Sequence, residues 1–342
     1  MPKEKIIATI GDPAGCGPYI TLKAIESLEN FGAQFFVVGD KEILNRFDVY
    51  KKISKRITLI DLDTPGINKL KPGYVSKLSG RASINYLKKA LEVMSEYGVK
   101  RLVTAPLSKE AVQLNLADFS GHSEYLADYF ECKIEMMMAA KKIKTVLFTR
   151  HIPFKKVPDF INEKNLSSTF NLVLKSLQEL FKIKRPKIAV ASLNPHAGIN
   201  TFFGSEEKTI HKVVRKFNGN FYGPYPPDSL FTQDSIKQYD CIIALYHDQG
   251  MIPFKLLSMK TGVNLTIGLP IIRTSPAHGV ALDIVRQNKK PFSSSMVEAI
   301  KLALRLSIPL PEYPWVNSGA GRRPTGAYFE REDHGHIRGA SV

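Results

Sequence analysis

The sequence predicts an α/β fold built on a mostly parallel sheet. Short apolar runs, such as residues 6–10 and 34–39, end at turns that contain Gly, Pro or Asp, and segments of helical periodicity follow them. This alternation of strand and helix is typical of a parallel sheet covered by helices. The 342 residues suffice for one large domain or for two ordinary domains, each with its own core.

The composition excludes several classes of protein. Hydrophobic residues make up 44% and charged residues 23%, which is ordinary for a globular enzyme, and no apolar run is long enough to span a membrane. The net charge of +16 comes from scattered basic pairs without interleaved aromatics, so nucleic-acid binding is not expected. The three cysteines are far apart, which fits a reducing cytoplasm, and the start of the chain lacks the features of a secretory signal.

A Gly- and Pro-rich turn follows the first predicted strand. Residues 6–18 read as strand, turn and helix start, with Gly11, Gly15 and Gly17 in the turn. This spacing is not GxGxxG, so the usual dinucleotide fingerprint is absent. The glycines either let the backbone pass close to another group or only turn the chain sharply.

The next signals lie in the middle of the chain. Residues 80–97 have helical periodicity, and the strand 101–105 follows them. Downstream, Gly121-His122-Ser123-Glu124 precedes another predicted helix. Ser123 is either an ordinary helix cap or, with His122, part of a substrate clamp, and these residues alone weigh the two evenly.

Three histidines each come after the end of a predicted buried strand. They are His151, His196 and His247. The carboxyl ends of parallel strands lie along one edge of a sheet, where open α/β sheets bind ligands. A single histidine in such a place is more often an ordinary polar residue, but three favour a metal site. Three imidazoles with an open fourth position are a zinc-type arrangement, although other divalent metals accept imidazole too.

The stretch 241–279 gathers most of the candidate chemistry. It contains an apolar strand, 241–246, and a second one, 263–272, that we expect to end at Arg273. The polar side chains that accompany these strands are His247, Asp248, Lys255, Asn264, Arg273 and His278. We interpret the stretch as the floor of an active site for an anionic substrate. Beyond a last amphipathic helix at 293–306, residues 307–342 are irregular in pattern and are predicted to be poorly ordered and to take no part in catalysis.

Taken together, the motifs resemble one enzyme family. GDPAGCGP, TAPLSKEAV, GHSE, TRHIP, SLNPHAG, GPYPPDSLF, YHDQGMIPFK and GVNLTIGLPIIRTSPAHG occur in this order. They resemble the 4-hydroxythreonine-4-phosphate dehydrogenases of vitamin B6 biosynthesis. The resemblance implies two α/β/α domains with a cleft between them, as in isocitrate and isopropylmalate dehydrogenases. We expect the first domain to comprise 1–130 and 270–306, and the second to comprise 131–269.

The resemblance also implies roles for individual residues. The metal ligands fall on His151, His196 and His247. The substrate-binding positions fall on His122, Ser123, Lys255, Asn264 and Arg273. The cofactor loop falls on His278, Gly279 and Asp283, and proton transfer is assigned to Asp248 or Lys255. At Ser123 the family commonly has threonine.

The implied activity is oxidation of 4-phosphohydroxy-L-threonine by NAD or NADP, followed by decarboxylation, in a cytoplasmic homodimer that holds one divalent metal (Zn, Mg or Co) per site. A related dehydrogenase of threonate or erythronate 4-phosphate is the nearest alternative. A histidine-metal hydrolase and a non-catalytic phosphate-ligand binding protein are alternatives from other classes. Absence of NADH formation would favour the hydrolase, and ligand binding without metal would favour the binding protein.

Overall fold

The computed structural model describes residues 4–198 and 204–308. The predicted irregular tail therefore lies almost entirely outside the described residues. The strands are β1 (Lys5–Thr9), β2 (Gln34–Gly39), β3 (Ile57–Asp61), β4 (Arg101–Thr104), β5 (Glu135–Ala140), β6 (Ile143–Leu147), β7 (Ile188–Ala191), β8 (Phe221–Tyr225), β9 (Cys241–Ala244), β10 (Val263–Ile267) and β11 (Ile272–Pro276).

Helices fill most of the connections between these strands. They are α1 (Gly17–Ser27), α2 (Lys41–Leu44), α3 (Asp48–Ile53), α4 (Lys77–Tyr97), α5 (Lys109–Gln113), α6 (His122–Tyr129), α7 (Val157–Phe160), α8 (Glu163–Glu179), α9 (Ser205–Lys216), α10 (Pro227–Leu230), α11 (Gln233–Ile236), α12 (His247–Ser258), α13 (Leu282–Arg286) and α14 (Ser294–Arg305). Short 3₁₀ turns are η1 (Ser54–Arg56), η2 (Ile67–Lys69), η3 (Phe154–Lys156) and η4 (Pro195–Gly198).

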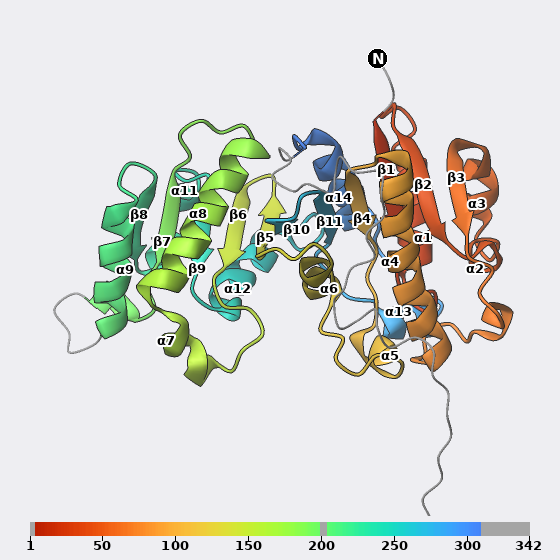
Figure 1. The fold of residues 1–342 in the computed structure, drawn as a ribbon, viewed down its shortest axis with the longest axis horizontal. Coiled ribbons are helices and arrows are strands. Elements are labelled where there is room, and N and C mark those ends of the chain that lie inside the picture. Colours follow the sequence, from red (N-terminus) through yellow and green to blue (C-terminus); the bar gives the residue numbers. More distant parts are fainter. Residues whose placement is uncertain (1–3, 199–203, 309–342) are drawn as a thin grey trace, which may run out of the picture.

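The described strands form one sheet that runs the length of the molecule (Figure 1). Its order is β3-β2-β1-β4-β11-β10-β5-β6-β9-β7-β8. The pairs at both ends of the sheet are parallel, whereas β11–β10, β10–β5 and β5–β6 are antiparallel. The predicted α/β class with a mostly parallel sheet is confirmed. The reversed strands lie in the middle, where the two parallel parts meet.

The predicted single strand 263–272 is wrong, because the chain reverses direction within it. Gly268 takes a φ of +96°, and a Cβ there would lie 2.3 Å from the carbonyl oxygen of Lys133. Only glycine fits such a turn. The segment therefore forms the antiparallel pair β10 and β11, and Arg273 lies inside β11 rather than beyond the end of a strand.

The register of the central strands places several polar residues on one face of the sheet. Arg273 pairs directly with Thr266 of β10 and with Leu102 of β4. Because side chains alternate along a strand, Thr104, two residues beyond Leu102, points to the same face as Arg273. Asn264 lies two residues before Thr266 and therefore shares this face too. The candidate site is built on this polar face.

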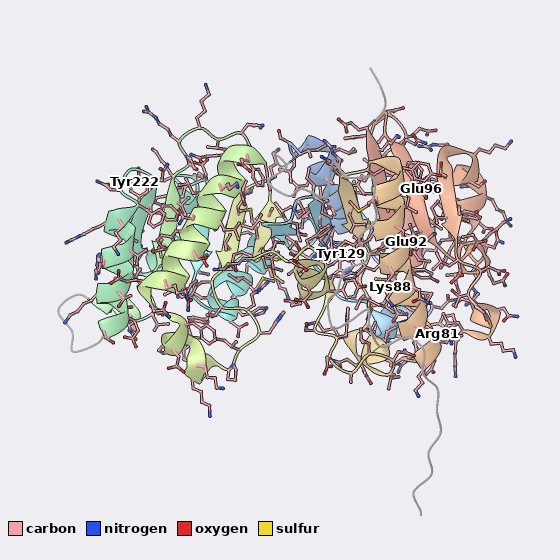
Figure 2. The ribbon with its side chains drawn as sticks, in the orientation of Figure 1. Arg81, Lys88, Glu92, Glu96, Tyr129 and Tyr222 are labelled. Carbon is pink, nitrogen blue, oxygen red and sulfur yellow. The ribbon has the colours of Figure 1, made fainter. Side chains whose placement is uncertain are left out.

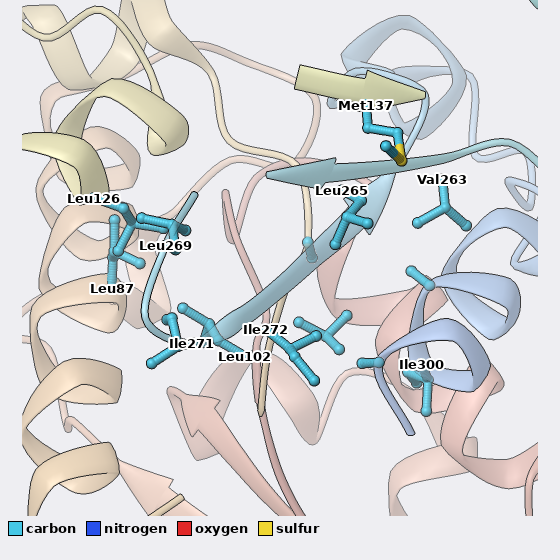
Figure 3. Close-up of a cluster of buried hydrophobic side chains, with 14 of the residues drawn as sticks. Leu87, Leu102, Leu126, Met137, Val263, Leu265, Leu269, Ile271, Ile272 and Ile300 are labelled. Carbon is cyan, nitrogen blue, oxygen red and sulfur yellow. The ribbon is translucent and has the colours of Figure 1, made fainter. Parts of the chain in front are cut away.

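The opposite face of the same strands is apolar and is covered by α14. Thr274, which follows Arg273, donates its hydroxyl to the Ala299 carbonyl of α14 at 2.9 Å. Leu265, Ile272 and Ile300 pack together on this side (Figure 3) and are at most 1% exposed. The apolar core on this face thus holds in place the strands whose opposite face carries the polar groups.

Helix α4 packs against α5, which follows the β4–α5 connection, and against the sheet. The Ser76 hydroxyl caps its start by accepting the Ser79 N–H at 3.0 Å, and Gly98 ends it in the left-handed region. Its outward side carries a row of charged residues that includes Arg81, Glu92 and Glu96 (Figure 2). Its inward side packs on the sheet and contacts α5. This division of polarity is what an amphipathic helix on a sheet requires.

The described strands fall into two groups along the sheet. Strands β1 to β4 and β11 lie at one end, and β5 to β10 lie at the other. The sheet is continuous between the groups, so the division into 1–130 plus 270–306 and 131–269 stays a prediction. Within residues 4–198 and 204–308, no helix has the length and apolar character needed to cross a membrane.

Replacing Gly80 with alanine tests the packing of α4 on α5. In an open helix this change stabilises by about 1 kcal/mol through helix propensity. Here an added Cβ would lie 1.8 Å from the Ala111 carbonyl oxygen, so we expect a loss of about 1–3 kcal/mol instead. Urea unfolding measures the difference, with Arg81→Ala on the outward side as the control. A Gly80→Ala midpoint equal to or above that of the unaltered protein would contradict this packing.

Candidate functional site

A cavity of about 170 Å³ lies on the polar face of the central strands. Its walls come from the β4–α5 connection, the start of α6, Met136 of β5, His151 in the loop after β6, and the loop after β11. The strands β10 and β11 contribute Asn264, Arg273 and Ser275. Segments distant in sequence therefore meet at one place, because β4, β11 and β10 are neighbours in the sheet.

The most buried charge in this cavity is the guanidinium of Arg273, whose residue is 2% exposed. Thr104 accepts its Nε–H at 3.2 Å and an Nη2–H at 2.7 Å. Its Nη1 group donates to Ser123 at 3.2 Å and to Thr266 at 2.9 Å. Burial lowers the pKa of Arg273 to about 10, which still leaves it charged at neutral pH. Neutral hydroxyls hold this cation, so its charge is available to an anion.

The GHSE segment forms the start of α6 and enters the cavity wall. Ser123 does not cap its helix; its hydroxyl contacts Arg273 and lies 3.2 Å from that of Thr266. Burial, with Arg273 and Lys109 nearby, lowers the pKa of His122 well below its usual value. The imidazole is therefore neutral near pH 7. This geometry supports the clamp interpretation of His122 and Ser123 over the simple cap.

Two further predicted residues present unpaired atoms in this cavity. Within the described part of the chain, the buried Oδ1 of Asn264 and Nε2 of His278 have no hydrogen-bond partner. His278 Nδ1 lies 2.9 Å from the Gly279 carbonyl oxygen, so Nδ1 carries the proton and Nε2 is an acceptor. Buried polar atoms are normally paired, so both atoms fit contacts to a ligand.

The sequence reasoning missed three charged residues at this site. Lys109 and Glu124 line the cavity, and Arg150 lies 3.7 Å from the Glu124 carboxylate. Both cations follow predicted strands, so the strand-end rule applied to the histidines would have found them too. Glu124 stands in the GHSE segment itself. It is the only acid among the described residues that line the cavity.

Two of the three predicted metal ligands come together. The rings of His151 and His247 have centroids 6.0 Å apart, and His151 lines the cavity. His196 is exposed in η4 with a φ of 54°, two residues before residue 198, where this described stretch ends. Across residues 4–198 and 204–308, no three His, Cys, Asp or Glu side chains are grouped closely enough to hold a metal. The donor set thus fits a metal at two positions and is incomplete at the third.

Buried side chains anchor the strand ends that carry these histidines. Gln249 accepts the Leu245 N–H at 2.6 Å and donates to the Ser192 carbonyl at 2.8 Å, which ties the end of β9 to the end of β7. Glu207 of α9 accepts the backbone N–H groups of residues 193 and 194 at 2.9 and 2.7 Å. These hydrogen bonds therefore hold in place the turn that begins at His247 and the turn that leads to His196.

The remaining predicted residues lie outside the cavity wall. Asp248 is exposed, and its Oδ1 lies 2.7 Å from His247 Nδ1, a contact that orients the imidazole. Lys255 is exposed on α12, and Asp283 is exposed on α13. Gly279 of the same loop does line the cavity. The roles predicted for all these residues stay predictions.

Known proteins show the same combination of sequence and fold. The chain matches the family of the pyridoxal phosphate biosynthetic protein PdxA over residues 22–303. The chain belongs to the PdxA family. It is 35% identical to the 4-hydroxythreonine-4-phosphate dehydrogenase of Sulfurihydrogenibium sp. (strain YO3AOP1), with 88% of this chain and 98% of the relative covered. It is 36% identical to the D-threonate 4-phosphate dehydrogenase of Salmonella typhimurium, with 90% and 100% covered.

Solved structures of PdxA-like proteins share the fold. The 4-hydroxythreonine-4-phosphate dehydrogenase of Klebsiella pneumoniae matches with a TM-score of 0.76 and 34% identity, covering 88% of this chain and 99% of that one. The sequence-based assignment to this family, and to a dehydrogenase, is therefore confirmed. The nicotinamide cofactor, the metal, decarboxylation and the homodimer stay predictions.

The Gly- and Pro-rich turn after β1 contacts two segments that contribute to the cavity wall of this PdxA family member, the β4–α5 connection and the loop after β11. The Asp12 N–H donates to the Pro106 carbonyl and the Cys16 N–H to the Val280 carbonyl, both at 2.9 Å. Gly11 has a φ of +67°, and a Cβ there would lie 2.3 Å from the Pro106 oxygen. The glycine thus serves both a sharp turn and a close approach, the two functions that the sequence left open.

Asp12 is a buried carboxyl in this turn, and its pKa predicts how stability depends on pH. It is fully buried; Oδ1 accepts the Ala14 N–H at 2.8 Å, and Oδ2 has no hydrogen-bond partner among the described residues. Burial raises its pKa from 3.8 to about 6. The folded state thus binds the proton more tightly, and stability from this group falls as pH rises from about 4 to 6.

We therefore expect Asp12→Asn to gain stability relative to the unaltered protein as pH rises through this interval. The difference in unfolding free energy should change by about 3 kcal/mol between pH 3.5 and 7, since one pKa unit corresponds to about 1.4 kcal/mol. Urea unfolding across this range measures it, with Asp234→Asn on the surface as the control. A pH-independent difference between the two proteins would show that Asp12 titrates normally.

Proposed function

We propose that the chain oxidises the C3 hydroxyl of 4-phosphohydroxy-L-threonine with NAD or NADP, in pyridoxine 5'-phosphate biosynthesis. The hydride passes to the nicotinamide and the hydroxyl proton is released. The resulting ketone is β to the carboxylate, which would be lost as carbon dioxide while C2 takes up one proton, leaving 3-amino-2-oxopropyl phosphate. The observation that carries this proposal is the cavity around Arg273, a buried cation without a carboxylate partner among its hydrogen bonds.

The phosphate end of the substrate fits the inner part of this cavity. A phosphate carries close to two negative charges and accepts charge-assisted hydrogen bonds most strongly from arginine. Arg273 supplies the positive charge, and Lys109 adds a second cation at the wall. Neutral His122 and the Ser123 hydroxyl supply donors without adding charge. An anionic phosphate bound here would balance the buried positive charge of Arg273.

The other polar groups of the cavity suit the rest of the substrate. The unpaired Oδ1 of Asn264 accepts a hydrogen bond from a hydroxyl or an ammonium group. Glu124 is a carboxylate in the same wall and favours a positively charged amine. This favours the amino-acid substrate over its hydroxy-acid analogue, because threonate has no amine.

We assign a divalent metal, zinc, magnesium or cobalt, to His151 and His247, with His196 as the third ligand. Burial lowers the pKa of His151, which keeps it neutral and able to ligate. Asp248 engages His247 Nδ1, so Nε2 is the nitrogen that we assign to the metal. Bound there, the metal supplies Lewis acidity near the hydroxyl that is oxidised.

A homodimer explains the position of Lys255. On α12, Ile252, Leu256 and Met259 are 60%, 83% and 78% exposed, and their spacing places them along one side of the helix. Such a stripe is typical of a surface that another protein covers. A second copy on α12 would bring Lys255 to the interface, where it is suited to move the hydroxyl proton. Asp248 is the other candidate for this step.

The nicotinamide cofactor is assigned to the loop that follows β11. His278 and Gly279 line the cavity, and Asp283 lies at the start of α13. The acceptor Nε2 of His278 fits a hydroxyl donor of the cofactor. A cofactor here would lie beside the substrate cavity, as hydride transfer requires.

Oxidation of D-threonate 4-phosphate is the second candidate, because identities to relatives with the two names are almost equal. Spectroscopic detection of NADH with each substrate separates the two. We expect faster turnover of 4-phosphohydroxy-L-threonine, loss of activity on chelation, and recovery with added divalent metal. Preference for the threonate would assign the alternative, and activity that survives chelation would remove the metal from the proposal.

Replacing Arg273 with alanine tests the phosphate assignment. We expect the variant to lose about 2–5 kcal/mol of binding free energy for the phosphorylated substrate, because the loss removes a buried charge partner. Substrate binding by calorimetry and steady-state kinetics measure this loss. Arg56→Ala is the matched control, since Arg56 pairs with Glu29 at 3.2 Å near the edge strand β3. Unchanged affinity in Arg273→Ala would refute the assignment.

A further inference from the structure

We propose that Thr266 fixes the direction of the Ser123 hydroxyl, so that Ser123 donates its proton into the cavity to an anionic ligand oxygen. Thr266 is then a positioning residue that acts through Ser123. The inference depends on the proposed function only for the phosphate as the ligand. It follows from the hydrogen bonds among Thr266, Ser123 and Arg273.

The three residues form a closed group on the polar face of the sheet. Arg273 Nη1 donates to Ser123 at 3.2 Å and to Thr266 at 2.9 Å, and the two hydroxyl oxygens lie 3.2 Å apart. Ser123 is 5% and Thr266 2% exposed. Ser123 lines the cavity, whereas Thr266 does not. Thr266 is therefore shielded from a ligand by its neighbours.

The hydroxyl proton of Thr266 determines which of the two hydroxyls, Thr266 or Ser123, donates the hydrogen bond between them. A hydroxyl has one proton to donate and two lone pairs to accept with, and arginine cannot accept. Within the described part of the chain, the hydrogen-bond partners of Thr266 Oγ1 are Arg273 and Ser123. The Ser123 oxygen is therefore the acceptor open to the Thr266 proton. The reverse direction would leave a buried donor unpaired, which costs about 1–3 kcal/mol.

With this polarity, both lone pairs of Ser123 are occupied. One accepts from Arg273 and the other from Thr266, so its own proton points away from both residues. Because Ser123 lines the cavity, that proton is available to a ligand. The guanidinium also draws hydroxyl oxygens toward itself and turns their protons outward. Ser123 thus becomes a donor and not an acceptor, which selects an anionic oxygen over a ligand N–H or O–H.

The test measures the affinity for inorganic phosphate by calorimetry, without cofactor or substrate. Thr266→Val keeps the shape of the side chain and removes its hydroxyl. We expect its Kd for phosphate to rise roughly tenfold, because Ser123 can then turn its proton elsewhere. Thr266→Ser restores the hydroxyl and should return the Kd to within about twofold of the original, which corresponds to about 0.4 kcal/mol.

Thr145→Val is the matched control. Thr145 is also a fully buried threonine in a central strand, and its hydroxyl has no partner among the described residues. The same substitution there should leave the phosphate Kd unchanged. Thermal unfolding of each variant shows whether it folds, and Thr266→Ala, which also removes the hydroxyl, takes the place of Thr266→Val if that variant does not fold.

A double-mutant cycle separates positioning from a direct contact. Ser123→Ala alone should weaken phosphate binding, and Thr266→Val should add little in the Ser123→Ala background, because the residue through which it acts is gone. Additive losses would overturn the proposal, as would an unchanged Kd in Thr266→Val or a Thr266→Ser variant as weak as Thr266→Val.

The outcome is distinguishable from failure of the proposed function. Coupled losses in phosphate affinity without NADH formation from either substrate would support the role of Thr266 and reject the dehydrogenase assignment. Normal turnover in an unaltered protein that does not bind inorganic phosphate would overturn the role of Thr266 and leave the dehydrogenase assignment in place.

Discussion

A buried arginine held by hydroxyls is the interaction on which the candidate site depends. Transfer of a guanidinium from water to a protein interior is unfavourable unless its N–H groups are paired and its charge is balanced. In this chain Thr104, Thr266 and Ser123 accept four hydrogen bonds from the guanidinium but bring no negative charge. The positive charge of Arg273 therefore has no carboxylate among its hydrogen-bond partners, and an anionic ligand can balance it. A carboxylate in place of Thr266 would neutralise Arg273 and reduce its attraction for a phosphate.

This arrangement requires the reversed strands in the middle of the sheet. Cross-strand partners lie about 5 Å apart, so the direct pair of Thr266 and Arg273 follows from the register of β10 and β11. The parallel pair of β11 and β4 then adds Thr104 on the same side. A shift of one residue would turn Arg273 toward the apolar face under α14. The core that fixes the register, around Leu265 and Ile272, therefore also fixes the site (Figure 3).

The sequence predicted those parts of the site that follow from local patterns. Strand ends marked by apolar runs pointed to His151 and His247. The GHSE segment was expected just before a helix, whereas its last three residues form the first turn of α6. The reversal at Gly268 was missed, because a continuous apolar run hides a turn whose reason is the distant Lys133 carbonyl. Lys109 and Arg150 follow predicted strands as the histidines do, but they were not singled out because cations are common along this basic chain. Which of these strand-end residues line the same cavity depends on the pairing register of the strands. That register is set by contacts between residues distant in sequence.

The charges of the cavity differ in their surroundings from the other charges of this strongly basic chain. A net charge of +16 attracts anions to the whole surface, but scattered lysines in water bind them weakly. Arg273 differs because it is buried, where charges interact more strongly than in water. Glu124 in the cavity wall interacts with the charge of Arg273 and also lies 3.7 Å from Arg150, so it offsets the field of Arg273 only in part. The cavity thus combines one buried positive centre with one negative group in its wall, an arrangement that fits our proposal of a phosphorylated amino acid as the substrate.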